Sequence, residues 1–137
     1  MKEVAIYFII YFPLLRENEK NKHITGATYL FLSATVTFII FKKEISVPAV
    51  MILTIADSFA AIVGKTTDSA TFFDKSVAGS LTFFFISLMI LYLFVPELGL
   101  LIPVVAVMVT FIEAVPLPIN DNLLISLATG IILYVLI

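Results

Sequence analysis

The chain has 137 residues, of which 61% are hydrophobic and only 13% charged, and its formal net charge is −2. Soluble domains carry about 45–50% apolar and roughly 25% charged residues, and a chain this small has too much surface to hide such an excess from water. The composition excludes a soluble enzyme, a disordered linker and a nucleic-acid-binding protein, and the absence of Cys excludes disulfides, thiol catalysis and thiolate metal sites. We predict a small membrane protein with a single domain, residues 1–137.

Six apolar segments are separated by polar or proline-containing breaks. They cover residues 4–15, 24–41, 45–63, 77–95, 98–117 and 123–137. The middle four have roughly the 20 residues that a membrane-crossing helix needs, whereas the first ends early at Pro13 and the last is also short. The pattern predicts an all-α fold without a sheet, a polytopic helical bundle with five or six transmembrane helices.

The basic residues of the loops favour one orientation of these helices. If all six segments cross, Lys2, Lys42 and Lys43 lie on one side of the membrane. The opposite side carries more basic residues, namely Arg16, Lys20, Lys22, Lys65 and Lys75. Because cytoplasmic loops are richer in Lys and Arg, this second side is predicted to face the cytoplasm.

The unusual polar residues gather near that same side. They are His23, Gly26, Lys65, Lys75, Ser76, Gly79, Glu113 and Asp121. A transporter or a pore would more often carry polar residues at mid-membrane depth. The arrangement therefore favours an enzyme whose active face meets a charged substrate from the cytosol.

Asp57 lies inside the third apolar segment. A carboxylate there costs roughly 2.5–3.5 kcal/mol on insertion scales, so it should face a partner helix, water or a metal. Ala56, Ala60 and Gly64 recur every four residues, which favours close packing of a second helix. Asp57, Ala61 and Gly64 share the adjacent face of the helix. The acid is therefore predicted to point along a tightly packed seam toward the cytoplasmic end.

The loop before the fourth apolar segment ends in Asp74-Lys75-Ser76. Asp74 or Ser76 can cap the following helix, and the free N–H groups of the first helical turn would form an anion site. Lys75 adds a positive charge, and Gly79 lets a phosphate or another backbone approach closely. The alternative is that Lys75 merely anchors the helix at the membrane boundary.

A second acid, Glu113, lies near the end of the fifth segment, which Pro116 and Pro118 terminate. Asp121 follows at the start of the next helix, where it would act either as a metal ligand or as a plain N-cap. Together with substrate phosphates, Asp57, Glu113 and Asp121 could converge on Mg²⁺, which prefers carboxylate, water and phosphate oxygens.

Three motifs occur in order along the chain. They are ADSFAAIVGK at 56–65, KSVAGS at 75–80, and Glu113 followed by DNL at 121–123. Together they resemble the polyprenol/lipid kinase family of membrane proteins, which includes dolichol kinase, phytol kinase and CTP-dependent diacylglycerol kinase and is related to phosphatidate cytidylyltransferase. HITGATY at 23–29 is similar to the family's entry into the preceding span.

The resemblance covers about residues 22–130. It implies transfer of the γ-phosphate of a nucleotide, CTP, to a membrane lipid alcohol such as dolichol, phytol or diacylglycerol, with Mg²⁺ as cofactor. The implied catalytic residues are Asp57 and Glu113. The implied metal ligands are Asp57, Glu113 and Asp121. The implied nucleotide- and phosphate-binding residues are Gly64, Lys65, Lys75, Ser76 and Gly79.

The sequence departs from the family pattern in two ways. Ala78 replaces a common Glu, which removes one metal ligand, and the family's additional N-terminal spans with a basic Arg-Lys motif are not found. We therefore expect either a part of the family domain or a minimal form of it. Two other functions remain open: cytidylyl transfer to a phospholipid, and a small transporter or assembly subunit that uses Asp57 and Glu113 as ion sites. The oligomeric state is left open.

Overall fold

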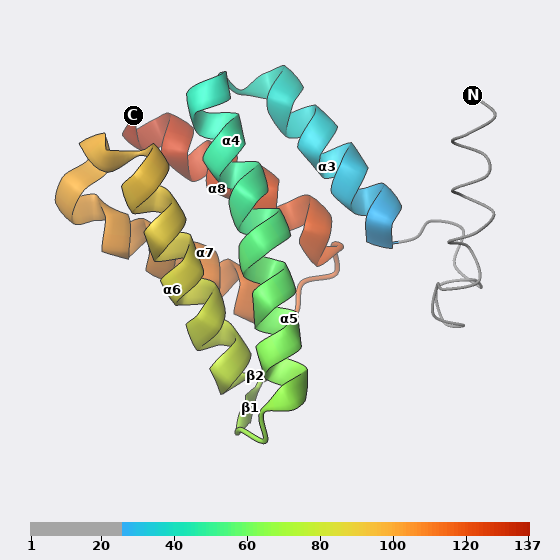
Figure 1. The fold of residues 1–137 in the computed structure, drawn as a ribbon. Helices are drawn as coiled ribbons and strands as arrows, with labels where there is room; N and C mark the ends of the chain where they lie inside the picture. The colour runs from blue at the N-terminus through green and yellow to red at the C-terminus, as the bar shows by residue number, and fades with distance from the viewer. Residues whose placement is uncertain (1–25) are drawn as a thin grey trace, which may run out of the picture.

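The computed structural model describes residues 26–137, so the predicted segment 4–15 and His23 lie outside the described residues. The described part is a helical bundle with one short hairpin (Figure 1). Its elements are α3 (Gly26–Ile40), α4 (Lys43–Met51), the π-helix η2 (Ile52–Ala56), α5 (Asp57–Thr66), β1 (Thr71–Phe72), β2 (Lys75–Ser76), α6 (Val77–Phe94), the 3₁₀ helix η3 (Pro96–Leu101), α7 (Ile102–Ala114) and α8 (Asp121–Leu136).

All five predicted segments after residue 23 form helices. Three continuous helical stretches, Lys43–Thr66, Val77–Phe94 and Pro96–Ala114, are long and apolar enough to cross a membrane. The helices Gly26–Ile40 and Asp121–Leu136 are apolar but shorter than the roughly 20 residues needed for a full crossing. The helical membrane fold is therefore confirmed in its general form, with three helices of spanning length in the described part.

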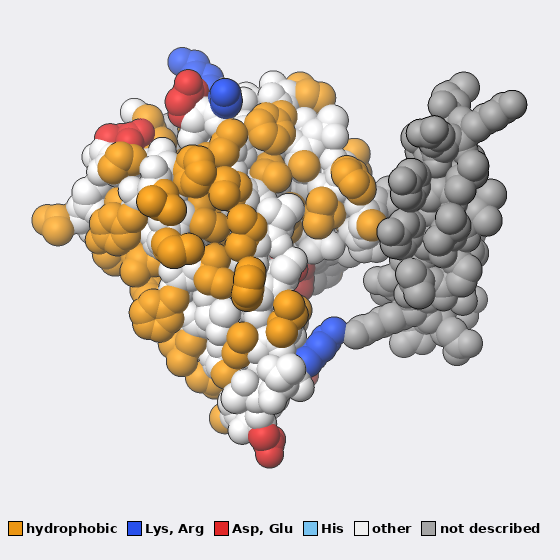
Figure 2. All heavy atoms as spheres, viewed as in Figure 1, with side chains coloured by type: hydrophobic (Ala, Val, Ile, Leu, Met, Phe, Trp, Pro, Cys, Tyr) orange, Lys and Arg blue, Asp and Glu red, His pale blue; other side chains and the backbone are white. Residues whose placement is uncertain are grey.

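The outer surface is hydrophobic. Between its two ends, the face in Figure 2 is largely covered by apolar side chains, and the charged side chains in view lie mainly toward the ends. Large residues such as Phe31, Phe85 and Leu93 are more than half exposed. Contiguous apolar surface of this extent is unusual for a soluble monomer and fits contact with lipid.

The expectation of no sheet was wrong. β1 and β2 form a short antiparallel hairpin with Phe72 opposite Lys75. Phe73 and Asp74 in the turn between them have φ angles of 48° and 66°, the left-handed values that a two-residue hairpin turn requires. This turn brings Lys75 back toward the bundle just before α6 begins. We call this end of the molecule the hairpin end.

Hydroxyl groups hold α3 against α8. The Ser33 hydroxyl donates to the carbonyl of Leu123 at 3.1 Å and is also hydrogen-bonded to Ser126. Thr37 Oγ1 lies 3.1 Å from Ser126 Oγ, and all three hydroxyl-bearing residues are fully buried. Such small polar contacts are a usual means of joining helices in a membrane.

α5 and α6 approach each other closely at their two glycines. A Cβ atom added at Gly79 would lie 2.8 Å from the carbonyl oxygen of Ala60, and its neighbour across the seam is the Cα of Gly64. Ala60 is buried on the same side of α5. The predicted packing role of the small residues is therefore confirmed for Ala60 and Gly64.

We expect Gly79→Ala to destabilise the protein by about 1–3 kcal/mol, because the new methyl group would push against backbone that cannot rotate away. Gly64→Ala should cost less, since its Cβ would meet mainly the Ser76 hydroxyl, at 2.7 Å. Thermal unfolding of both variants in detergent measures the difference. An unchanged melting temperature for Gly79→Ala would show that α5 and α6 are not packed this tightly.

Candidate functional site

A cavity of about 260 Å³ lies at the hairpin end, between α5, α7, the hairpin and the start of α6. Its lining combines charged and small residues, namely Asp57, Ala60, Ala61, Gly64, Lys65, Asp74, Lys75, Ser76, Gly79, Ser80 and Glu113. We call it the polar cavity. It contains seven of the eight residues implied as a site by the family resemblance, and the eighth, Asp121, is joined to it through Lys75.

Lys75 links three separate parts of the chain at this cavity. Its Nζ donates hydrogen bonds to Glu113 Oε1 at 2.9 Å and to Asp121 Oδ2 at 3.1 Å. The hairpin, the end of α7 and the start of α8 are thereby held together by one ammonium group. Lys75 therefore does more than anchor a helix at the membrane boundary, which was the alternative role.

The charge on Lys75 is maintained by its neighbours. Burial of the amine opposes the charged form, but the hydrogen bonds and negative charges of Glu113 and Asp121 outweigh this effect and raise the pKa of Lys75 above its ordinary value. Lys75 is therefore a cation at neutral pH. It remains 35% exposed, so a ligand can reach it.

Glu113 is the most deeply buried charged residue of the described chain. Its side chain is 3% exposed, and Oε2 has no hydrogen-bond partner among residues 26–137. A buried carboxylate oxygen without a partner is costly and usually signals a bound ion, a water or a ligand. Oε2 thus stays without a partner in the described chain, in a residue that lines the polar cavity.

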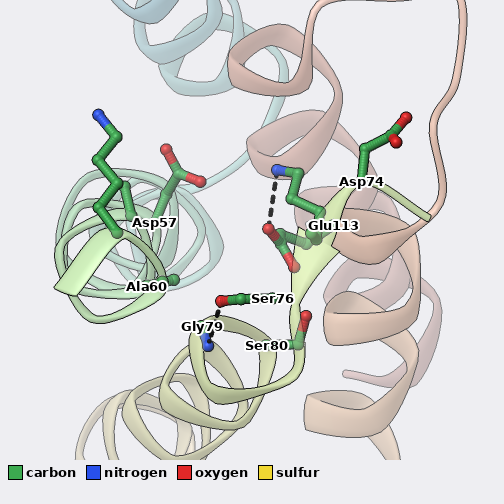
Figure 3. A pocket seen from close by; sticks show the side chains of 11 residues that line it. Asp57, Ala60, Asp74, Ser76, Gly79, Ser80 and Glu113 are labelled. Carbon is green, nitrogen blue, oxygen red and sulfur yellow. Dashed lines mark hydrogen bonds and ion pairs between the residues drawn. The ribbon is translucent and has the colours of Figure 1, made fainter. Parts of the chain in front are cut away.

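Asp57 lies on the other side of the same cavity. Figure 3 shows Asp57 on α5 and Glu113 facing it, with both carboxylates turned toward the space between them. Both acids therefore face the polar cavity and not the outer surface of the bundle. The Asp57 carboxylate makes no hydrogen bond within the described residues, but its charge is attracted by Lys75 and repelled by Glu113 and Asp121.

A π-helix places Asp57 in this position. The amide of Asp57 donates to the carbonyl of Ile52, five residues earlier, where an α-helix would use the residue four positions back. The Thr54 hydroxyl also donates to the Val50 carbonyl at 2.9 Å and supports this irregular turn. Single π turns inside helices are frequent at functional sites. The extra residue rotates Asp57 relative to α4, which no residue pattern in the sequence indicated.

The prediction that free backbone amides at the start of α6 form an anion site was wrong, because the first amides of that helix already donate hydrogen bonds within the chain. The amide of Val77 donates to the Ala70 carbonyl at 2.9 Å, that of Ala78 to Ser69 Oγ at 3.3 Å, and that of Gly79 to Ser76 Oγ at 3.0 Å. Of the two caps that the sequence offered, Asp74 and Ser76, it is Ser76 that caps α6. Phosphate binding by the described residues would thus depend on lysine side chains.

Asp121 has a different role from the one its position alone suggests. The N-cap of α8 is Asn120, whose side chain accepts from the amide of Asn122 at 3.0 Å. Asp121 is the first residue of the helix and pairs with Lys75. The alternative that Asp121 is a plain N-cap was therefore wrong.

Lys65, in the last turn of α5, lines the polar cavity.

Among residues 26–137, no three His, Cys, Asp or Glu side chains are placed to hold a metal ion together. The ammonium group of Lys75 lies between two of the implied ligands, Glu113 and Asp121. Magnesium is often bound by only one or two carboxylates together with phosphate oxygens and water. Within residues 26–137, Asp57 makes no hydrogen bond and Glu113 Oε2 has no partner. These two acids fit Mg²⁺ only in that mode, together with a phosphorylated ligand.

Two polar lining residues were not expected as site residues. Asp74 was considered only as a helix cap, and Ser80 only as part of the KSVAGS motif. Ser80 lies one turn after Ser76 on α6, so helical spacing from Ser76 is the signal that could have found it. Asp74 reaches the cavity only because of the hairpin turn.

The chain is 35% identical over 121 residues to an uncharacterized protein of Rickettsia prowazekii (strain Madrid E), an alignment that covers 83% of this chain and 59% of the relative. The chain thus spans less than two thirds of that relative's length. No family model and no solved structure matches the chain.

Proposed function

We propose that this chain carries the active site of a multi-pass membrane enzyme that transfers the γ-phosphate of CTP to the hydroxyl of a membrane lipid alcohol, with the hairpin end in the cytoplasm. The observation that carries the proposal is Glu113. One of its oxygens is held by Lys75, the other is buried without a partner among residues 26–137, and the residue lines the same cavity as Asp57. The motifs shared with lipid kinases support the choice of reaction.

The charges of the cavity suit phosphoryl transfer, which depends mainly on positioning and on electrostatic stabilisation. Lys65 and Lys75 would attract the phosphates. Mg²⁺, held by Asp57 and Glu113 together with phosphate oxygens, would neutralise the charge that develops on the transferred group. These acids would repel a phosphate without such a cation, so nucleotide and metal are expected to bind together.

The reaction exchanges one phosphorus–oxygen bond for another. The lipid oxygen bonds to the γ-phosphorus, the bond from that phosphorus to the bridging oxygen breaks, and CDP leaves. The hydroxyl proton passes to a carboxylate. Asp57, the acid without a hydrogen bond of its own in the described chain, would receive it.

Purified protein in detergent, supplied with Mg²⁺, CTP and in turn a polyprenol, phytol or diacylglycerol, tests this function. We expect a phosphorylated lipid with at least one of the three alcohols and less product when ATP replaces CTP. If the lipids are unmodified with every nucleotide while the protein is folded, the proposal is wrong.

Lys75→Ala should weaken CTP binding much more than Lys42→Ala. Lys75 lines the polar cavity, and its removal also leaves Glu113 as an unbalanced negative charge facing the phosphates. Lys42 is exposed at the opposite end of α4–α5 and does not line the cavity. Losing one charged hydrogen bond to phosphate corresponds to roughly a tenfold to hundredfold weaker affinity. Titration with a fluorescent CTP analogue measures it, and equal affinities for the two variants would refute a role of Lys75 in nucleotide binding.

A further inference from the structure

A second cavity, of about 450 Å³, lies beside the polar cavity on the outer side of α6 and α7. Its lining is almost wholly apolar and consists of Phe72, Val77, Ser80, Leu81, Phe84, Val107, Thr110, Phe111 and Ala114. We call it the apolar groove. Leu81, Val107 and Phe111 are each more than half exposed, so the groove is open to the surroundings of the bundle.

The apolar groove and the polar cavity meet at Ser80. Ser80 lines both of them, and Ala114 in the groove is the residue next to Glu113 in the cavity. From Val77 to Phe84 the groove follows α6 for about 10 Å, at 1.5 Å per residue. Both α6 and α7 belong to stretches long and apolar enough to cross a membrane. The groove therefore runs along the outer side of α6 and α7, from the polar cavity toward the middle of these two apolar helices.

We infer that the apolar groove holds the hydrocarbon chain next to the hydroxyl of the acceptor lipid, so that the hydroxyl passes Ser80 into the polar cavity. The inference rests on the proposed function and names the route of its second substrate. A polar cavity joined to an apolar groove matches an amphiphile with a small polar head and a long chain.

The physical role of the groove would be alignment. Lipid chains in a bilayer are as apolar as the groove, so the hydrophobic effect gives the chain little reason to leave the bilayer. Packing against Phe84 and Phe111 would instead restrict the chain to one direction and present its hydroxyl to the acids. Affinity would come from the polar head, and the groove would decide which lipid shapes are accepted.

Photolabelling with a long-chain primary alcohol that carries a diazirine in its chain tests this route. With the full chain in detergent and the crosslinked peptides mapped by mass spectrometry, we expect label on α6 and α7 at groove residues. Val107→Phe should fill the groove and remove most of this label. Val104→Phe is the matched control, because Val104 lies on the same helix with similar exposure but does not line the groove. In this variant the labelling of the groove residues should be unchanged.

Labelling and phosphorylation separate the two proposals. Label in the groove that Val107→Phe removes supports the route even if no lipid is phosphorylated, in which case only the proposed reaction fails. Label spread evenly over the exposed helices, or equally affected by Val104→Phe and Val107→Phe, overturns the route even if the protein is an active kinase.

Discussion

Asp57→Asn should abolish phosphoryl transfer and leave the fold intact. The amide keeps the shape of the carboxylate but removes the charge that would hold Mg²⁺ and accept the hydroxyl proton. Loss of one group that stabilises developing charge lowers turnover roughly 100- to 1,000-fold in other enzymes. Asp57 makes no hydrogen bond within the described residues and lies in a helical stretch of spanning length, so a neutral amide should be tolerated there.

Mg²⁺-dependent lipid phosphorylation by the variant in detergent measures this effect, with the melting temperature as the test of folding. Asp68→Asn is the matched control, because Asp68 lies in the exposed loop after α5 and does not line the polar cavity. Wild-type turnover in Asp57→Asn would refute the catalytic role and favour a non-enzymatic function. A turnover loss of equal size in Asp68→Asn would show that the effect is not specific to the cavity.

Lys75→Met should destabilise the protein, because it leaves Glu113 buried without its positive partner. Breaking a buried ion pair costs roughly 3–5 kcal/mol. Lys75 is 35% exposed and Asp121 39%, so solvent screens part of the interaction and we expect about 2 kcal/mol. The raised pKa of Lys75 means that this stabilisation is fully present below the ordinary lysine pKa and is lost only as pH rises through the raised value. Measurements at neutral pH therefore report the complete ion pairs.

The double variant Lys75→Met/Glu113→Gln separates stability from function. Removing both charges should restore most of the lost stability, since no unpaired buried charge remains. It should not restore CTP binding, which needs the lysine charge. Thermal unfolding and CTP titration on the same samples test both expectations. A double variant no more stable than Lys75→Met would show that Glu113 is not the partner that makes Lys75 necessary for folding.

Hydrophobic pattern and helical spacing were sufficient to predict the helices and one face of the site. Each segment predicted after residue 23 is a helix, because long apolar runs leave few other ways to satisfy the backbone in a membrane. Asp57, Ala61 and Gly64 all line the polar cavity, as their spacing predicted. Ser76 caps α6, and the prolines after Glu113 follow the end of α7.

Features that depend on tertiary contacts could not be predicted. The turn at Phe73-Asp74 lacks the glycine that usually marks a tight hairpin, so the hairpin was missed. The π-helix before Asp57 has no sequence signature. The amides at the start of α6 looked free because their partners, Ser69 and Ala70, are brought back by that same hairpin. The shared contact of Lys75 with Glu113 and Asp121 joins residues 38 and 46 positions apart, which local patterns do not report.

The central claim is that the polar cavity transfers the terminal phosphate of a nucleotide to a lipid, and labelled CTP tests it most directly. Purified protein is incubated with Mg²⁺, lipid alcohol and CTP that carries radioactive phosphorus at either the γ or the α position, and the lipid fraction is counted. We expect label in the lipid from γ-labelled CTP and none from α-labelled CTP, with the transfer lost in Asp57→Asn. Label transferred from the α position, or no transfer from either position by folded protein, would contradict the claim.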